Sequence, residues 1–161
     1  MIRMERDLKE SGSLRVGDRD AFYGVGSLVR NGVESAGGLP LPFLIERLRD
    51  GLPFRELEEL RALLDLPMER LAAHLGISRA TLHRRKVAGR LDPGESDRVV
   101  RFARLLGLAV ATMESLEAAR AWMAAPQFGL GGETPLSYAE TEVGAREVED
   151  LLARIEYGVY S

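Results

Sequence analysis

The stretch from Leu66 to Arg90, LPMERLAAHLGISRATLHRRKVAGR, constrains the fold of this chain more than any other. Its first half carries an apolar stripe at helical spacing, formed by Leu71, Ala72, Leu75 and Ile77. Gly76 predicts the end of that helix, because glycine adopts positive φ without strain. Ser78 is a suitable N-cap for a second helix, from Arg79 to about Val87, in which Leu82 is the one clear core anchor. This spacing predicts a helix-turn-helix whose second helix is the recognition helix.

Basic side chains are concentrated in that second helix. Residues 78–91 contain five cations and no acid, in a chain of formal net charge −3. The five are Arg79, Arg84, Arg85, Lys86 and Arg90. A phosphate backbone attracts such a patch, so we predict DNA binding here over the alternative of an ordinary solvated basic face. The residues predicted to contact DNA are Ser78, Arg79, Ala80, Thr81, His83 and Arg84.

Arg85 departs from the usual helix-turn-helix pattern. It lies three residues after Leu82, at a position that is normally apolar. We expect its guanidinium either to pair with a carboxylate or to reach a partner molecule.

The chain divides into three predicted parts: a flexible N-terminal segment over residues 1–38, a helix-turn-helix domain over 39–107 and a C-terminal domain over 108–161. Within the first part, apolar residues between Phe22 and Val29 allow one short element among many glycines. Apolar periodicity predicts one helix from Pro40 to Gly51 and another that Pro53 opens. Because no segment leaves room for a sheet, the predicted fold class is all-α, with a small α-helical domain after the helix-turn-helix.

A longer helix is predicted over residues 92–106. Asp92 as N-cap, Pro93 at the first helical position and Glu95 three residues after the cap form a strong start signal. The broad apolar face of this helix includes Phe102 and Leu105. One helix-turn-helix reads only a half-site, so we expect a homodimer and expect part of this face to form its interface.

The C-terminal domain is predicted to contain three helices: Leu116–Ala124, a short one capped by Thr134, and a last one capped by Thr141 with Gly158 as its C-cap. The apolar side of the last helix is formed by Val143, Val148, Leu151, Leu152 and Ile155. Between residues 140 and 156 the acids outnumber the bases by six to two. The chain is therefore basic in its middle and acidic toward its end.

Catalysis has little basis in this sequence. The two histidines, His74 and His83, have no carboxylate at metal-ligand spacing and no nucleophile nearby, and there is no cysteine. The GLGG loop follows a helix and lacks a Gly-Lys-Ser/Thr sequence, so it is not a phosphate-binding loop. We predict no enzymatic activity, cofactor or metal. A charged N-terminus and the lack of an apolar run of about 18 residues predict a cytoplasmic protein without membrane contact.

From about Leu39 to Ser161 the chain resembles the Xre/MbcA/ParS-type antitoxins, which are partners of RES-domain toxins. The helix-turn-helix alone is weakly specific, whereas the C-terminal segments are much more so. The segments that carry the resemblance are LGISRATLHRRK (75–86), ESDRVVRFARLL (95–106), AWMAAP (121–126), LGGETPL (130–136) and TEVGAREVEDLLARIEYGVYS (141–161). The Arg85 exception belongs to the family's Arg-Arg-Lys pattern.

This resemblance implies an antitoxin with two roles. The C-terminal domain would neutralise a cognate RES toxin, whose relatives resemble ADP-ribosyltransferases and consume NAD, and the helix-turn-helix would bind the operator DNA of its own operon. The residues expected to bind the toxin are Gly131, Gly132, Arg154, Glu156, Tyr157, Val159, Tyr160 and Ser161. The last five residues are expected to block the toxin's substrate pocket. The alternative is a transcriptional regulator whose C-terminal domain only dimerises or senses a ligand.

Overall fold

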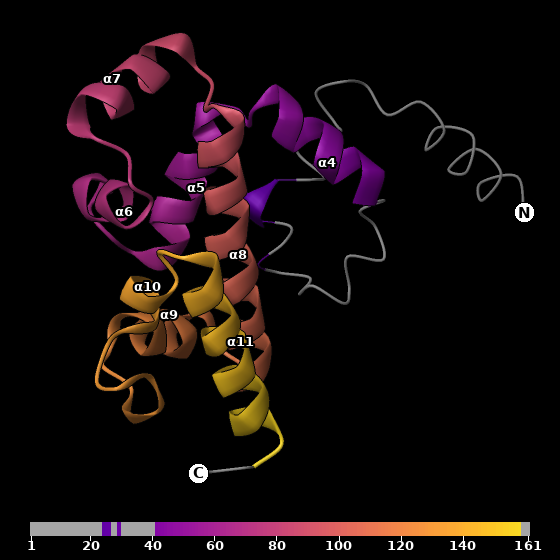
Figure 1. Cartoon of the computed structure of the whole chain (residues 1–161), viewed down its shortest axis with the longest axis vertical. Helices are drawn as coiled ribbons and strands as arrows, with labels where there is room; N and C mark the ends of the chain where they lie inside the picture. The colour runs from indigo at the N-terminus through magenta and orange to yellow at the C-terminus, as the bar shows by residue number, and fades with distance from the viewer. Residues whose placement is uncertain (1–23, 27–28, 30–40, 159–161) are drawn as a thin grey trace, which may run out of the picture.

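The computed structural model describes residues 24–26, 29 and 41–158, and this part of the chain is built from helices and short connections (Figure 1). The helices are α4 (Leu41–Asp50), α5 (Phe54–Leu64), α6 (Met68–His74), α7 (Arg79–Ala88), α8 (Pro93–Met113), α9 (Leu116–Ala124), the 3-10 helix η1 (Phe128–Leu130), α10 (Pro135–Tyr138) and α11 (Glu142–Glu156). No strand occurs among these residues, where Pro53 and Arg90 form one isolated bridge. The predicted all-α class is confirmed.

The longest helix, α8, begins as the sequence predicts. The Asp92 carboxylate accepts the backbone N–H of Glu95 at 2.7 Å, and the Glu95 carboxylate accepts that of Asp92 at 3.0 Å, which completes a capping box. The predicted end at Leu106 is wrong, because α8 continues through Gly107 to Met113. Burial of Gly107 and Ala109 on the packed side of the helix outweighs the cost of about 1 kcal/mol that glycine adds within a helix.

Helix α8 is the centre of the core. It packs against α4, α5, α9 and α11, and Figure 1 shows it running through the middle of the molecule. Phe102 and Leu105 are fully buried within this single chain. Because Phe102 and Leu105 are buried within one chain, they cannot form the dimer interface that was predicted for part of this apolar face.

Helix α11 lies along α8 (Figure 1) and is attached to it by charge as well as by apolar packing. Arg101 Nε lies 3.2 Å from Glu142 Oε2, and Arg104 Nη2 lies 2.9 Å from Glu149 Oε1. Both pairs advance in the same direction along the two helices, so α8 and α11 run parallel. Glu142 and Glu149 of α11 therefore stabilise the packing of the two helices and are not part of an unpaired acidic surface.

Two details of α11 differ from the prediction. Val143 is 74% exposed, although Val148 and Leu152 on the predicted apolar side are buried. The helix ends at Glu156 with Tyr157 as its C-cap, and Gly158 follows at φ +70°. Gly158, the predicted C-cap, thus lies one position beyond the observed C-cap, where a glycine with positive φ commonly follows a helix.

A short piece of the N-terminal segment belongs to the core. Val25 and Val29 are buried, at the place where the sequence allowed one short element within the predicted flexible segment. The backbone N–H of Val25 donates to Glu56 Oε2 at 2.7 Å, and a Cβ on Gly24 would lie 2.9 Å from both oxygens of that carboxylate. Burial raises the pKa of Glu56, against the lowering effect of the Val25 hydrogen bond. This carboxylate therefore anchors a segment outside the helix-turn-helix.

Helix α7 stands away from the rest of the molecule (Figure 1) and has no buried residue. Leu82, predicted as its core anchor, is partly buried and packs against the core. Arg85 adds a second attachment: its Nε donates to Glu95 Oε1 at 2.7 Å and its Nη2 to Asp92 Oδ2 at 3.2 Å. The predicted pairing of Arg85 with a carboxylate is thus confirmed, and the carboxylates are those of the α8 capping box.

Substitution of Glu56 tests the N-terminal anchor. The native pKa of Glu56 is raised, so the folded state binds more protons than the unfolded one, and this group's contribution to stability falls as pH rises through the raised pKa. Glu56→Gln keeps an acceptor without the charge and is expected to remove that fall. Glu56→Ala leaves the Val25 N–H unpaired and is expected to cost about 1–3 kcal/mol at all pH values. Urea unfolding at a series of pH values measures both, and equal stability of the two variants would refute the anchor.

Substitution of Arg85 tests the attachment of α7. Arg85→Ala leaves the buried Glu95 without its cation and is expected to lower Tm. Arg84→Ala is the matched control, because Arg84 is exposed and its guanidinium donates only to the Thr81 hydroxyl, at 3.0 Å, within the described residues. Calorimetry should show a loss for the first variant only. The same Tm for both would mean that Arg85 does not hold the helix.

Candidate functional site

Helix α7 presents the predicted DNA-contacting residues on one element. Ser78 is its N-cap, and the Ser78 hydroxyl oxygen accepts the backbone N–H of Thr81 at 3.2 Å. Thr81 is half-buried and the other five are exposed. These residues, Ser78, Arg79, Ala80, Thr81, His83 and Arg84, lie within two turns of the helix start, where a major-groove helix makes its base contacts.

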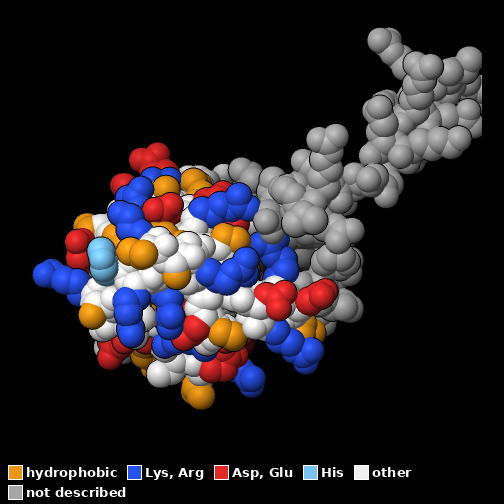
Figure 2. Space-filling model, turned by 90° about the horizontal axis from the view of Figure 1, so that it is seen from above, with side chains coloured by type: hydrophobic (Ala, Val, Ile, Leu, Met, Phe, Trp, Pro, Cys, Tyr) orange, Lys and Arg blue, Asp and Glu red, His pale blue; other side chains and the backbone are white. Residues whose placement is uncertain are grey.

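The basic patch is smaller than the sequence count. Arg85 pairs with Asp92 and Glu95, and Arg90 Nη1 donates to the backbone oxygen of Gly51 at 2.6 Å. Arg79, Arg84 and Lys86 form no ion pair within the described part of the chain. Figure 2 looks down on this end of the molecule and shows Lys and Arg side chains spread over it, with a histidine among them. Three of the five predicted cations are thus available to a ligand.

The loop around η1 contains two of the residues assigned to toxin binding. Gly131 and Gly132 have φ of +67° and +86°, which explains why glycine occupies both positions. The loop lies against α11, since a Cβ on Gly129 would come within 2.8 Å of Leu151 Cδ1. The structure therefore brings this loop next to the second half of α11.

The end of α11 holds the other described residues of that set. Arg154 is half-buried, Glu156 is exposed and Tyr157 is 79% exposed. The Tyr157 ring consequently does not pack back onto the domain. Val159, Tyr160 and Ser161, which complete the predicted set, lie outside the described residues.

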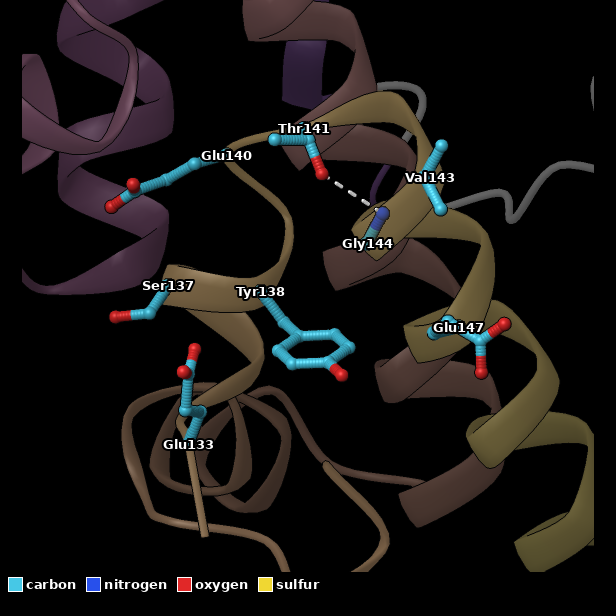
Figure 3. A pocket seen from close by; sticks show the side chains of 8 residues that line it. All are labelled: Glu133, Ser137, Tyr138, Glu140, Thr141, Val143, Gly144 and Glu147. Carbon is cyan, nitrogen blue, oxygen red and sulfur yellow. Dashed lines mark hydrogen bonds between the residues drawn. The ribbon is translucent and has the colours of Figure 1, made fainter. Parts of the chain in front are cut away.

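An open pocket of about 330 Å³ lies where α10 meets α11 (Figure 3). The Tyr138 ring occupies its middle, with Glu133 on the side of the η1 loop and Glu147 on α11. Thr141 caps α11 at the rim, its hydroxyl oxygen accepting the Gly144 N–H at 3.0 Å. Val143 lines the same pocket while remaining exposed, so the pocket combines acidic and apolar side chains.

One contact joins the helix-turn-helix to this pocket. His74 Nδ1 of α6 lies 2.9 Å from Glu140 Oε1, in the turn before α11. Arg101 of α8 donates to the backbone oxygen of Glu140 at 3.4 Å. His74 therefore links the helix-turn-helix to the C-terminal part of the chain.

The described residues contain no cluster of three histidine or acidic side chains that could hold a metal ion. None of the helices in this part combines the length and hydropathy needed to cross a bilayer. No pattern in the sequence indicates that Glu133, Tyr138 and Glu147 line one pocket, because they come from three separate segments. Phe128 was not predicted as a functional residue either, although an aromatic residue among loop glycines was an available signal.

Two comparisons with known protein families match nearly all of the described helices. Residues 43–104 match the Antitoxin Xre-like helix-turn-helix domain. Residues 108–158 match the Antitoxin Xre/MbcA/ParS C-terminal toxin-binding domain. The basic helix α7 thus lies in the first domain, whereas the η1 loop, the pocket and α11 lie in the second.

Individual relatives agree. The chain is 36% identical over 120 residues to an Antitoxin Xre of Yersinia enterocolitica, covering 73% of this chain and 81% of the relative. It is 33% identical over 122 residues to an Antitoxin Xre of Photorhabdus laumondii, covering 74% and 82%. With a helix-turn-helix followed by a toxin-binding domain, the chain belongs to the Xre family of type II antitoxins.

Proposed function

We propose that this antitoxin neutralises an NAD-consuming RES-domain toxin through its C-terminal domain and represses its own operon through α7. The observation that carries the proposal is the separation of the two surfaces: exposed cations on α7, in the helix-turn-helix match, and an acidic, partly apolar surface in the toxin-binding match. The matches to a helix-turn-helix domain and to a toxin-binding domain favour a binding protein over an enzyme.

DNA binding is supported by the form of α7. The helix projects from the body of the molecule, and Arg79, Arg84 and Lys86 are exposed on it. Ala80 is small enough for the backbone near the helix start to approach base edges. The chain has an overall negative charge, so binding to phosphates would depend on this local patch.

Toxin binding is proposed for two groups of residues. The η1 loop contributes Gly131 and Gly132, and the end of α11 contributes Arg154, Glu156 and Tyr157, followed by Val159, Tyr160 and Ser161. Contact between the loop and α11 at Gly129 and Leu151 supports a common surface. The ring of Tyr157 is exposed, which supports a role in contacting a partner rather than in packing the domain.

A second candidate function is a transcriptional regulator whose C-terminal domain senses a ligand, for which the pocket around Tyr138 is the supporting observation. Co-expression with the neighbouring reading frame distinguishes the two. The antitoxin proposal expects a stable complex and loss of the neighbour's NAD-consuming activity. If the neighbour neither binds nor consumes NAD, the proposal is wrong.

Arg84→Ala is expected to weaken operator binding and to leave toxin neutralisation unchanged. A lost base contact costs about 1–3 kcal/mol, which a gel-shift titration detects easily. Arg146→Ala is the charge-matched control, since Arg146 is an exposed arginine on α11 that pairs only locally with Glu142 within the described structure. Unchanged affinity of Arg84→Ala would show that α7 is not the recognition helix.

We also propose a homodimer, because specific recognition by a helix-turn-helix needs two half-sites about one helical turn apart. With Phe102 and Leu105 inside the monomer, the interface must use other residues. Light scattering at micromolar concentration, with and without operator DNA, is expected to give at least twice the mass of one chain. A monomer under both conditions would exclude the dimer.

A further inference from the structure

Phe128 differs from the other phenylalanines whose side chains the structure describes. Its side chain is 99% exposed, whereas Phe54 and Phe102 are buried. It is the first residue of η1 and lies within the matched toxin-binding domain. Aromatic residues are enriched at protein–protein interfaces relative to the rest of the surface, so an exposed phenylalanine in a toxin-binding domain is a candidate contact residue.

The loop that carries Phe128 is ordered by its own hydrogen bonds. The Gln127 N–H donates to Glu133 O at 3.0 Å, and the Gly132 N–H donates to Gln127 O at 2.9 Å, which closes the loop at its base. The Gln127 side chain donates to Trp122 O at 3.1 Å and to Ala125 O at 3.2 Å, which ties the loop to the end of α9. On the other side Gly129 fits closely against Leu151 of α11. The ring is thus held outward on a preorganised support, which lowers the entropic cost of binding.

The pocket to which the Phe128 loop contributes Glu133 is acidic. Glu133 is joined to Gln127 through the backbone and lines the pocket that Glu147 borders from α11 (Figure 3). In the part of the chain that the structure describes, neither carboxylate takes part in an ion pair, whereas Glu140 of the same pocket is engaged by His74. An exposed apolar side chain on a loop that also contributes Glu133 to an acidic pocket is complementary to an apolar socket bordered by Arg or Lys.

A second copy of this chain fits that description poorly. In a two-fold symmetric contact each residue of the patch lies near the same patch of its partner, so Glu133 and Glu147 would approach their own counterparts. Repulsion between like charges would then oppose burial of the two rings. DNA is excluded by the same carboxylates, because it offers phosphates rather than cations.

We propose that Phe128 is a docking residue for the cognate toxin, inserting its ring into an apolar socket of the toxin whose rim is basic. The negative charges of Glu133 and Glu147 would attract the Arg or Lys side chains of that rim. The inference rests on the proposed toxin-neutralising function and adds to it the residue that anchors the complex. Rigid aromatic residues at the centre of an interface commonly carry most of its binding energy.

The test uses the full-length antitoxin and a catalytically inactive form of the protein encoded by the neighbouring reading frame. Phe128→Ala is expected to weaken the complex at least tenfold by calorimetric titration, with unchanged Tm and unchanged operator binding, because Phe128 makes no core contact. Val87→Ala is the matched control: Val87 is an equally apolar side chain, 75% exposed, on α7 outside the toxin-binding domain. Its toxin affinity is expected to equal that of the wild type.

The charged rim has a test of its own. Glu133→Gln and Glu147→Gln are expected to weaken the complex, with an effect that shrinks as salt is added. If neither substitution changes the affinity for the toxin, the proposal of a basic rim around the toxin's socket is wrong.

The possible outcomes separate the two proposals. If the wild type binds the neighbour and Phe128→Ala binds equally well, Phe128 is not the anchor although the proposed function stands. If Phe128→Ala instead changes the antitoxin's mass in light scattering and leaves toxin affinity unchanged, a second copy covers the ring and the inference is wrong. If the wild type does not bind the neighbour, the proposed function fails and this inference fails with it.

Discussion

Burial of the apolar face of α8 is the interaction on which the rest of this structure depends. Phe102, Leu105 and Leu106 are fully buried, and α5 and α9 pack against the helix that carries them. Removing this face from water unites elements of both matched domains around one core. The capping box at its start has a second use, because the carboxylates that begin α8 also hold Arg85 and thereby α7. The same few residues fix the central helix and the proposed DNA-reading helix.

Local signals made most of the fold predictable. Side-chain caps at Ser78, Asp92, Thr134 and Thr141 start helices where the sequence predicts them, since each cap depends only on its near neighbours. The sequence-based predictions were wrong where tertiary packing decides how long a helix is or which of its side chains are buried. Gly107 reads as a helix end in isolation, but its neighbours are buried on α8 and the helix continues. Val143 fits the apolar period of α11, yet nothing in the described structure covers it.

The candidate sites likewise divide into residues that local sequence signals predict and residues that tertiary packing brings together. Residues of the α7 surface follow one another in sequence, so helical periodicity was enough to predict which of them would be exposed. The acidic pocket and the packing of the Phe128 loop depend on segments that meet only after folding, and no spacing rule relates Gly129 to Leu151 or Glu133 to Glu147. The internal use of Arg85 and Arg90 was likewise not evident from a count of charges, because their acceptors lie on α8 and after α4.

The continuity of α8 has a mechanical consequence. This one helix of 21 residues spans the boundary between the helix-turn-helix region and the toxin-binding region, and at 1.5 Å per residue it is about 30 Å long. There is no linker between the two regions to absorb a change of angle. Helix α8 therefore connects the two regions rigidly, and in the proposed complex a toxin bound at one end would have a fixed position relative to DNA bound at the other. The architecture of the promoter complex would follow from the length and twist of this helix.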